Sequence, residues 1–220
     1  SGGKEKAEAY GISGIARFAL GDLLGALDDY NNAIRFNPKF SVAYFNRGNV
    51  HRAQGDLANA LTDYNEAILL APEFAVAYLN RGTIHNEQGN QKAALEDFNQ
   101  SIRLNPTDSA AYINRGLIRY AQGSVMSAIK DYDRAIELNP EDATTYINRG
   151  VAWRAIGNLS NAAKDYDLAI QLNPQFASAY YNRGLVRYSS GEFLEAIADY
   201  DQAIQLNPKD AAAYNNRGLT

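Results

Sequence analysis

Apolar and polar positions along the chain follow a pattern that returns every 34 residues. Counting from residue 7, positions 4, 5, 8, 9 and 10 of each repeat are mostly apolar or small, and a glycine follows at position 15. Positions 20, 24 and 27 then carry Ala, an aromatic residue, and Ala or Ser, which share one face at helical spacing. Each repeat is therefore expected to form two amphipathic helices joined by a short turn.

Glycine, capping side chains and proline predict where these helices begin and end. The glycine at position 15 ends the first helix. Position 16 carries a preferred N-cap side chain (Asp, Asn or Ser) in five of six repeats, so the second helix is expected to start there. Proline at position 32 disfavours helical geometry in the residue before it, which closes the second helix. These prolines are Pro38, Pro72, Pro106, Pro140, Pro174 and Pro208.

The string Tyr-x-Asn-Arg-Gly sets the boundaries of the repeats, because it returns in steps of 34 residues from Tyr44 to Tyr214. Residues 1–6 are expected to be a lead-in, in which Ser1, Gly2 and Gly3 are interpreted as the remnant of a removed tag. A fragment of a further first helix is expected at 211–220. The six complete repeats are predicted at residues 7–40, 41–74, 75–108, 109–142, 143–176 and 177–210.

This pattern resembles the tetratricopeptide repeat family, with Tyr at position 4, Gly at 8, Ala at 20, Tyr or Phe at 24, Ala at 27 and Pro at 32. The resemblance covers nearly the whole chain. It implies an all-α fold, an α-solenoid of stacked antiparallel helix pairs that form a right-handed superhelix. The first helices would line a concave groove, and each repeat would contact only its neighbours.

Position 7 departs from the family, which usually has Leu there, because six repeats carry arginine. Six aspartates at position 23 match these arginines in number. Pairing each aspartate with the arginine of the next repeat, as in Asp29 with Arg47 and Asp199 with Arg217, uses all twelve residues. We therefore predict a structural ladder in this register, in preference to an arginine row for anionic ligands.

Glycine at position 8 lies inside the first helix, where it costs about 1 kcal/mol relative to alanine. A close approach of the two helices of a repeat would offset this cost. Position 8 is expected to face the small residues at positions 20 and 27, such as Ala60 and Ala67.

An asparagine row supplies the first candidate binding site. The resemblance assigns the concave surface to positions 2, 5, 6, 9, 12 and 13 of the first helices. An amide carries both donors and an acceptor, which suits an extended peptide backbone, and the row is similar to the asparagine ladder of O-linked N-acetylglucosamine transferase. Each amide could instead bond to a neighbouring helix and order the stack, and the sequence leaves both readings open. The row comprises Asn46, Asn80, Asn114, Asn148, Asn182 and Asn216.

Aromatic and basic residues around this row are the other candidate peptide contacts, because aromatic residues and arginine are enriched at binding hot spots. Leu79, Ile113 and Ile147 are expected to pack between helices instead. The candidate contacts are Phe45, Tyr120, Tyr181, Tyr188, Arg52 and Arg154.

Composition narrows the function classes. With 21 basic and 25 acidic residues the net charge is -4, which argues against nucleic acid as a partner. The chain has no Cys and no phosphate loop, nucleophile elbow or His-Glu-x-x-His motif. His51 and His85 share position 11 without a third ligand, so no metal or cofactor is expected. The basic clamp that some relatives use for chaperone tails is also missing from positions 2, 5 and 6.

The sequence thus predicts a non-enzymatic scaffold, or assembly factor, that binds a peptide or protein segment in its concave groove. Two alternatives remain: a substrate-recruiting or regulatory region of a longer enzyme, and an architectural module that associates end to end through Tyr214 and Leu219. No apolar run approaches the roughly 20 residues that span a bilayer, so a soluble protein is expected. The compartment stays open, with the cytoplasm favoured over the periplasm or a lumen.

Overall fold

The structure is a computed structural model that describes residues 2–220, so Ser1 of the expected tag remnant lies outside it. Those residues form thirteen α-helices and no strand, and the first helix already begins within the expected lead-in. The helices are α1 (Gly2–Ala19), α2 (Leu23–Phe36), α3 (Ser41–Ala53), α4 (Leu57–Leu70), α5 (Ala75–Glu87), α6 (Gln91–Leu104), α7 (Ser109–Ala121), α8 (Val125–Leu138), α9 (Ala143–Ala155), α10 (Leu159–Leu172), α11 (Ala177–Ser189), α12 (Phe193–Leu206) and α13 (Ala211–Leu219).

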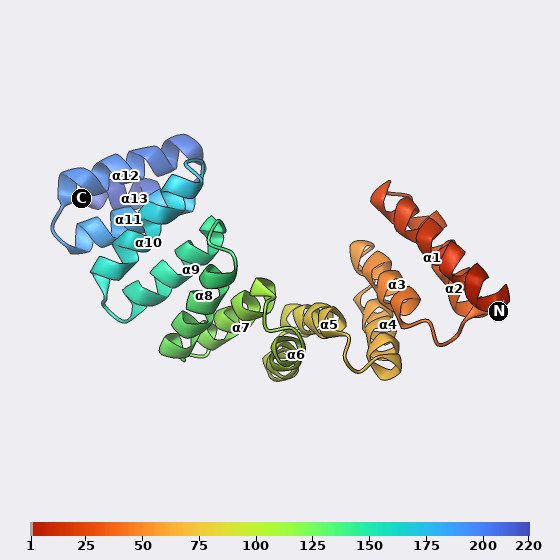
Figure 1. Cartoon of the computed structure of the whole chain (residues 1–220). Helices are drawn as coiled ribbons and strands as arrows, with labels where there is room; N and C mark the ends of the chain where they lie inside the picture. The colour runs from red at the N-terminus through yellow and green to blue at the C-terminus, as the bar shows by residue number, and fades with distance from the viewer. Residues whose placement is uncertain (1) are drawn as a thin grey trace. The chain divides into compact units, whose positions relative to one another are not determined.

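The helices fall into two compact units (Figure 1). The N-terminal unit contains α1 to α6 and ends at Pro106, and the C-terminal unit runs from Thr107 to Thr220 with α7 to α13. Within each unit a first helix packs against the second helix of its own repeat, and that second helix packs against the next first helix. Successive first helices also touch, as α1 and α3 do in one unit and α7, α9 and α11 in the other. This stacking confirms the predicted all-α solenoid.

The turns inside the repeats have the geometry that the sequence predicts. All six glycines at position 15 adopt positive φ, between 77° at Gly123 and 81° at Gly191, a left-handed conformation that favours glycine. Four of the six position 16 side chains cap the second helix, and Asp56, for example, accepts from the backbone N–H of Asn59 at 3.1 Å. Ser124 occupies the N-cap position without a side-chain cap bond, as does the remaining Glu at position 16.

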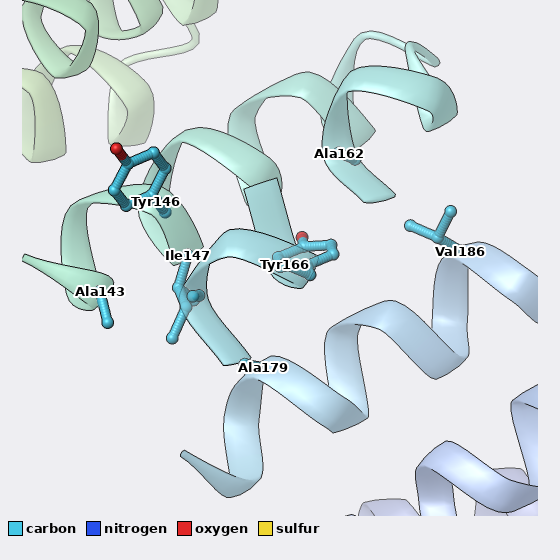
Figure 2. Close-up of a cluster of buried hydrophobic side chains, with 8 residues drawn as sticks. Ala143, Tyr146, Ile147, Ala162, Tyr166, Ala179 and Val186 are labelled. Carbon is cyan, nitrogen blue, oxygen red and sulfur yellow. The ribbon is translucent and has the colours of Figure 1, made fainter. Parts of the chain in front are cut away.

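The core of each repeat is built from the aromatic ring at position 24, the alanine at position 20 and the small residue at position 27, which is Ser101 in one repeat and alanine in the others. Figure 2 shows one such cluster, in which Tyr166 of α10 lies between Ile147 of α9 and Val186 of α11. The Tyr166 side chain is fully buried, as are the neighbouring Ala162 and its counterparts in the other repeats. Rings of this size dominate the apolar area that each repeat removes from water.

The glycines at position 8 approach this ring more closely than the small residues they were expected to face, although a Cβ atom added to Gly48 would also lie 3.3 Å from the backbone oxygen of Ala60 at position 20. A Cβ atom added to Gly116 would lie 2.7 Å from the ring of Tyr132. The same holds within 2.7–2.9 Å for the other complete repeats, with Phe98 replacing tyrosine in one of them. The small residues at positions 20 and 27 are buried, but the missing side chain makes room for the aromatic ring between the helices. The predicted close approach of the two helices is confirmed, and the aromatic ring at position 24 is the neighbour that the prediction missed.

The arginine–aspartate ladder exists, but its predicted register is wrong, because five of the six arginines pair with the aspartate at position 23 of their own repeat. Arg47 donates from Nε and Nη2 to the carboxylate of Asp63 at 2.9 and 2.6 Å, a bidentate pair that raises the pKa of Arg47. Asp63 is 2% exposed. The other own-repeat pairs are Arg81–Asp97, Arg115–Asp131, Arg149–Asp165 and Arg183–Asp199.

The register was predicted by matching six arginines with six aspartates one to one, but each guanidinium has a further nitrogen, Nη1, that can bind a second partner. Nη1 of Arg149 donates to Asp133, a residue at position 25 of the preceding repeat, at 2.7 Å. One arginine thus serves its own repeat and the preceding one, and its partners need not match it one to one. At the ends, Asp29 accepts from Ser13 at 2.6 Å, and Arg217 reaches Asp201 at 2.6 Å. The ladder does join repeats, through position 25.

Candidate functional site

The asparagine row has two kinds of members. All six side chains are half-buried on successive first helices. Asn80 donates from Nδ2 to Oδ1 of Asn49 in the preceding repeat at 2.9 Å, and Asn216 donates to the hydroxyl of Tyr181 at 3.0 Å. Asn182 bonds to a carbonyl of its own helix. Two members therefore couple neighbouring repeats, as the stacking interpretation requires.

The other three amides, those of Asn46, Asn114 and Asn148, make no hydrogen bond to any residue in the described part of the chain. A half-buried amide without a protein partner retains both donors and its acceptor for water or a ligand. Asn114 and Asn148 lie on α7 and α9, two helices that touch one another. The site residues that remain open to a ligand are thus a subset of those predicted.

The aromatic candidates differ in how far their neighbours cover them. Phe45 packs against Tyr64 and Phe74, with ring centroids 5.8 and 4.9 Å apart, and belongs largely to the core. Tyr181 packs against Tyr200 at 6.1 Å. Such rings contribute mainly to packing between helices.

Tyr120 and Tyr188 occupy position 12 on α7 and α11. Tyr120 is half-buried against the cluster around Tyr132. Tyr188 remains 42% exposed and meets Phe193 edge-on, with centroids 5.6 Å apart. Tyr188 therefore has the largest free ring surface among the predicted aromatic contacts.

Arg52 and Arg154 also occupy position 12, and their surroundings differ. Arg52 of α3 donates to Glu87 of α5 at 3.0 Å, an ion pair that joins two adjacent first helices. Arg154 on α9 forms no ion pair with any described residue, and its buried Nε atom lies near the hydroxyl of Tyr166 without normal hydrogen-bond geometry. Of these two predicted contact residues, only Arg52 has its charge compensated by a neighbour.

An apolar hollow in the N-terminal unit was not anticipated from the sequence. It has a volume of about 300 Å³ and lies between α1 and α3, beside Asn46. Ile12, 70% exposed, stands where the other repeats carry asparagine, and Ile15 and Val42 also line the hollow. The signal was present as the break in the asparagine row at Ile12.

Position 11 plays a structural part that the sequence analysis also missed. Arg119 donates to Asp131 at 2.8 Å and Arg187 to Asp199 at 2.8 Å, so these arginines are second partners of the ladder aspartates. His51 lies in the same place, with Nε2 3.8 Å from Asp63. No group of three or more His, Asp or Glu side chains within residues 2–220 is arranged to hold a metal ion.

None of the helices described is long and apolar enough to cross a membrane.

Tyr214 and Leu219, on which end-to-end association would depend, are exposed. That association stays a prediction.

Two models of protein families match the sequence of this chain, and both describe repeats of paired helices like those in the structure. A family model described as TPR repeat matches residues 14–52, 116–153, 152–191 and 184–220, and one described as Tetratricopeptide repeat matches residues 45–109. Together these matches cover most of the chain. No match was found among curated proteins.

Solved structures with the same fold include YrrB, described as a TPR protein with an unusual peptide-binding site. It is 24% identical with a TM-score of 0.75, over 86% of this chain and 98% of that one. The pilF protein of Pseudomonas aeruginosa is 18% identical with a TM-score of 0.87 and full coverage of both chains. MamA is 26% identical with a TM-score of 0.69, over 75% of this chain and 96% of that one. These likenesses show that the chain shares its fold with these proteins.

Proposed function

The chain belongs to the tetratricopeptide repeat family, and we propose that it is a non-catalytic scaffold that binds an extended segment of another protein along its first helices. The observation that carries this proposal is the pair of unpartnered amides of Asn114 and Asn148 on the adjacent helices α7 and α9. A peptide backbone presents alternating N–H and C=O groups, which an amide can satisfy at the same time.

The spacing of the helices suits such a ligand. Packed helices lie about 8–10 Å apart, and an extended chain advances about 3.3 Å per residue. Amides on neighbouring first helices would therefore meet the ligand backbone at about every third residue. Side chains between these points would meet the exposed face of Tyr188.

An amide-deletion comparison tests the proposal. The double variant Asn114→Ala, Asn148→Ala removes two amides that have no partner within the protein, so its fold should be unchanged in circular dichroism. The control variant Gln171→Ala, Gln205→Ala removes two exposed amides from the second helices α10 and α12. Both are used with wild type in affinity capture from lysate of the source cells, followed by mass spectrometry.

We expect partners that are captured by wild type and by the control but lost from the Asn114, Asn148 variant. Partners retained equally by all three proteins would contradict binding along the row. The variant Asn80→Ala separates binding from stacking, because Asn80 bonds to Asn49 and its loss should lower stability instead.

A further inference from the structure

Arg154 is a half-buried cation for which the described chain supplies no carboxylate. Its buried Nε atom meets no acceptor in normal hydrogen-bond geometry, and the nearby hydroxyl of Tyr166 does not neutralise its charge, whereas the ladder arginines each have at least one aspartate. A buried donor without a good acceptor lowers the stability of the fold. Such a group is either a structural defect or part of a site that a ligand completes.

The sequence explains why Arg154 is unpaired. Arg52 forms an ion pair with Glu87, which occupies position 13 of the following repeat, at a distance of 3.0 Å. The equivalent residue for Arg154 is Ser189, whose hydroxyl donates to the carbonyl of Leu185 on its own helix. The same arginine position is therefore neutralised inside the N-terminal unit and left uncompensated in the C-terminal unit.

Two buried tyrosines interact with the charge of this guanidinium. Burial raises the pKa of Tyr166 to about 12, and the charge of Arg154 together with a weak hydrogen bond between the two side chains opposes this rise. Burial also raises the pKa of Tyr200 to about 12, with Tyr181 and Tyr188 adding to the shift and Arg154 opposing it. Arg154 thus lies among aromatic rings, where part of its hydration is already removed and an ion pair is stronger than in open water.

Arg154 is also isolated among the concave-face positions 2, 5, 6, 9, 12 and 13. On α7, α9, α11 and α13, these positions carry Ala, Ile, Asn, Leu, Thr, Val, Ser and Tyr, and Arg154 is their one charged residue. The whole chain carries a net charge of -4. Because Arg154 is the single charged side chain at these positions, it would favour a ligand with one anionic group at the residue that lies next to it.

We propose that Arg154, flanked at position 12 by Tyr120 and Tyr188, is a carboxylate-binding subsite of the C-terminal unit. This inference rests on the proposed function and names the chemistry of the ligand: an acidic side chain, or the free C-terminus, of the bound segment. The carboxylate takes the place that Glu87 occupies beside Arg52.

A direct test follows the side-chain Nε–H resonances of the arginines by nuclear magnetic resonance, with Arg154→Lys as the assignment variant. Sodium acetate is the probe, and sodium chloride at equal ionic strength is the reference. We expect the Arg154 resonance to shift saturably with acetate and that of Arg52 to stay in place. An Arg154 resonance that does not move, or moves equally with chloride, overturns the proposal.

Two matched variants test the cause. Ser189→Glu supplies Arg154 with the internal partner that Arg52 has, and should abolish the acetate response. Glu87→Ser removes the partner of Arg52 and should give that arginine a response of its own. Both positions are exposed and lie at the C-terminal end of a first helix, so the fold should persist in circular dichroism. A Ser189→Glu protein that responds like wild type contradicts the inference.

Three synthetic peptides of one Leu- and Ser-containing sequence identify the source of the carboxylate. The first has a central Glu and an amidated end, the second a central Gln and a free C-terminus, and the third a central Gln and an amidated end. A charge-assisted hydrogen bond predicts that the first or second binds wild type about tenfold more tightly than the third. All three should bind the Arg154→Gln variant equally.

The outcomes separate this inference from the proposed function. If all three peptides bind wild type equally, and binding is lost in the Asn114, Asn148 variant, the groove function stands and the Arg154 subsite is refuted. If acetate shifts the Arg154 resonance but no peptide binds, the carboxylate site stands and binding of extended segments along the row loses its support.

Discussion

Arg52 in the N-terminal unit and Arg154 in the C-terminal unit stand three repeats apart at the same repeat position. One is paired with Glu87, and the other has no carboxylate partner among the described residues. The contacts that hold each repeat together are the same in both units. The glycine at position 8 packs against the aromatic ring at position 24, and the arginine at position 7 forms a bidentate pair with the aspartate at position 23. The comparison shows that positions 7, 8, 23 and 24 keep the same structural contacts in both units, whereas the contacts at position 12 differ between the units.

The glycine–ring contact should give the largest effect when it is broken. Gly116→Val places side-chain atoms where the Tyr132 ring lies, and Gly48→Val does the same against Tyr64 in the other unit. We expect each variant to lose about 3 kcal/mol of unfolding free energy, measured by chemical denaturation.

Gly218 provides the control for this prediction, because no atom lies within 4 Å of a Cβ added there. Gly218→Ala should stay within about 1 kcal/mol of wild type. A Gly116→Val protein as stable as Gly218→Ala would show that the ring does not constrain position 8.

The ladder register should give an intermediate effect. In a double-mutant cycle, Arg149→Ala and Asp165→Ala should show a coupling energy of about 2 kcal/mol, because each single variant leaves a partly buried charge without its bidentate partner. The cycle of Arg149 with Asp131, the pair of the register predicted from counting, should show almost none. Equal coupling in the two cycles would be incompatible with the observed pairing.

The hydroxyl of Tyr166 should give the smallest effect. It is buried and has no hydrogen bond of normal geometry, so Tyr166→Phe should change the unfolding free energy at pH 7 by only about 1 kcal/mol, and Phe98 already fills this position in the N-terminal unit. Above pH 10 the unfolded tyrosine ionises, whereas burial keeps the folded one neutral up to about pH 12.

This difference fixes the sign of the pH dependence. The raised folded-state pKa stabilises the native state below pH 10, and the contribution is lost as the pH rises towards 12. The Phe variant should therefore lose less stability than wild type between pH 10 and 12, as thermal melts in that range would show. Parallel stability curves for the two proteins would refute this account.

The sequence by itself determined the repeat, its two helices, their glycine turns and their proline ends, since each depends on local backbone preferences that return every 34 residues. It also identified the row of six asparagines and the two position 12 arginines as candidates. Both sets could be identified because the regular 34-residue spacing assigns each residue to a position on its helix.

Only the tertiary structure decided which partners these side chains find. Arg149 bonds to its own-repeat Asp165 and to Asp133, and Asn80 is engaged by Asn49 while Asn114 has no partner within the described chain. The physical reason is that a guanidinium or an amide offers several donors, and their distribution depends on distances between helices that periodicity does not specify. Which neighbour each donor reaches was therefore decided by the packing of one repeat on the next.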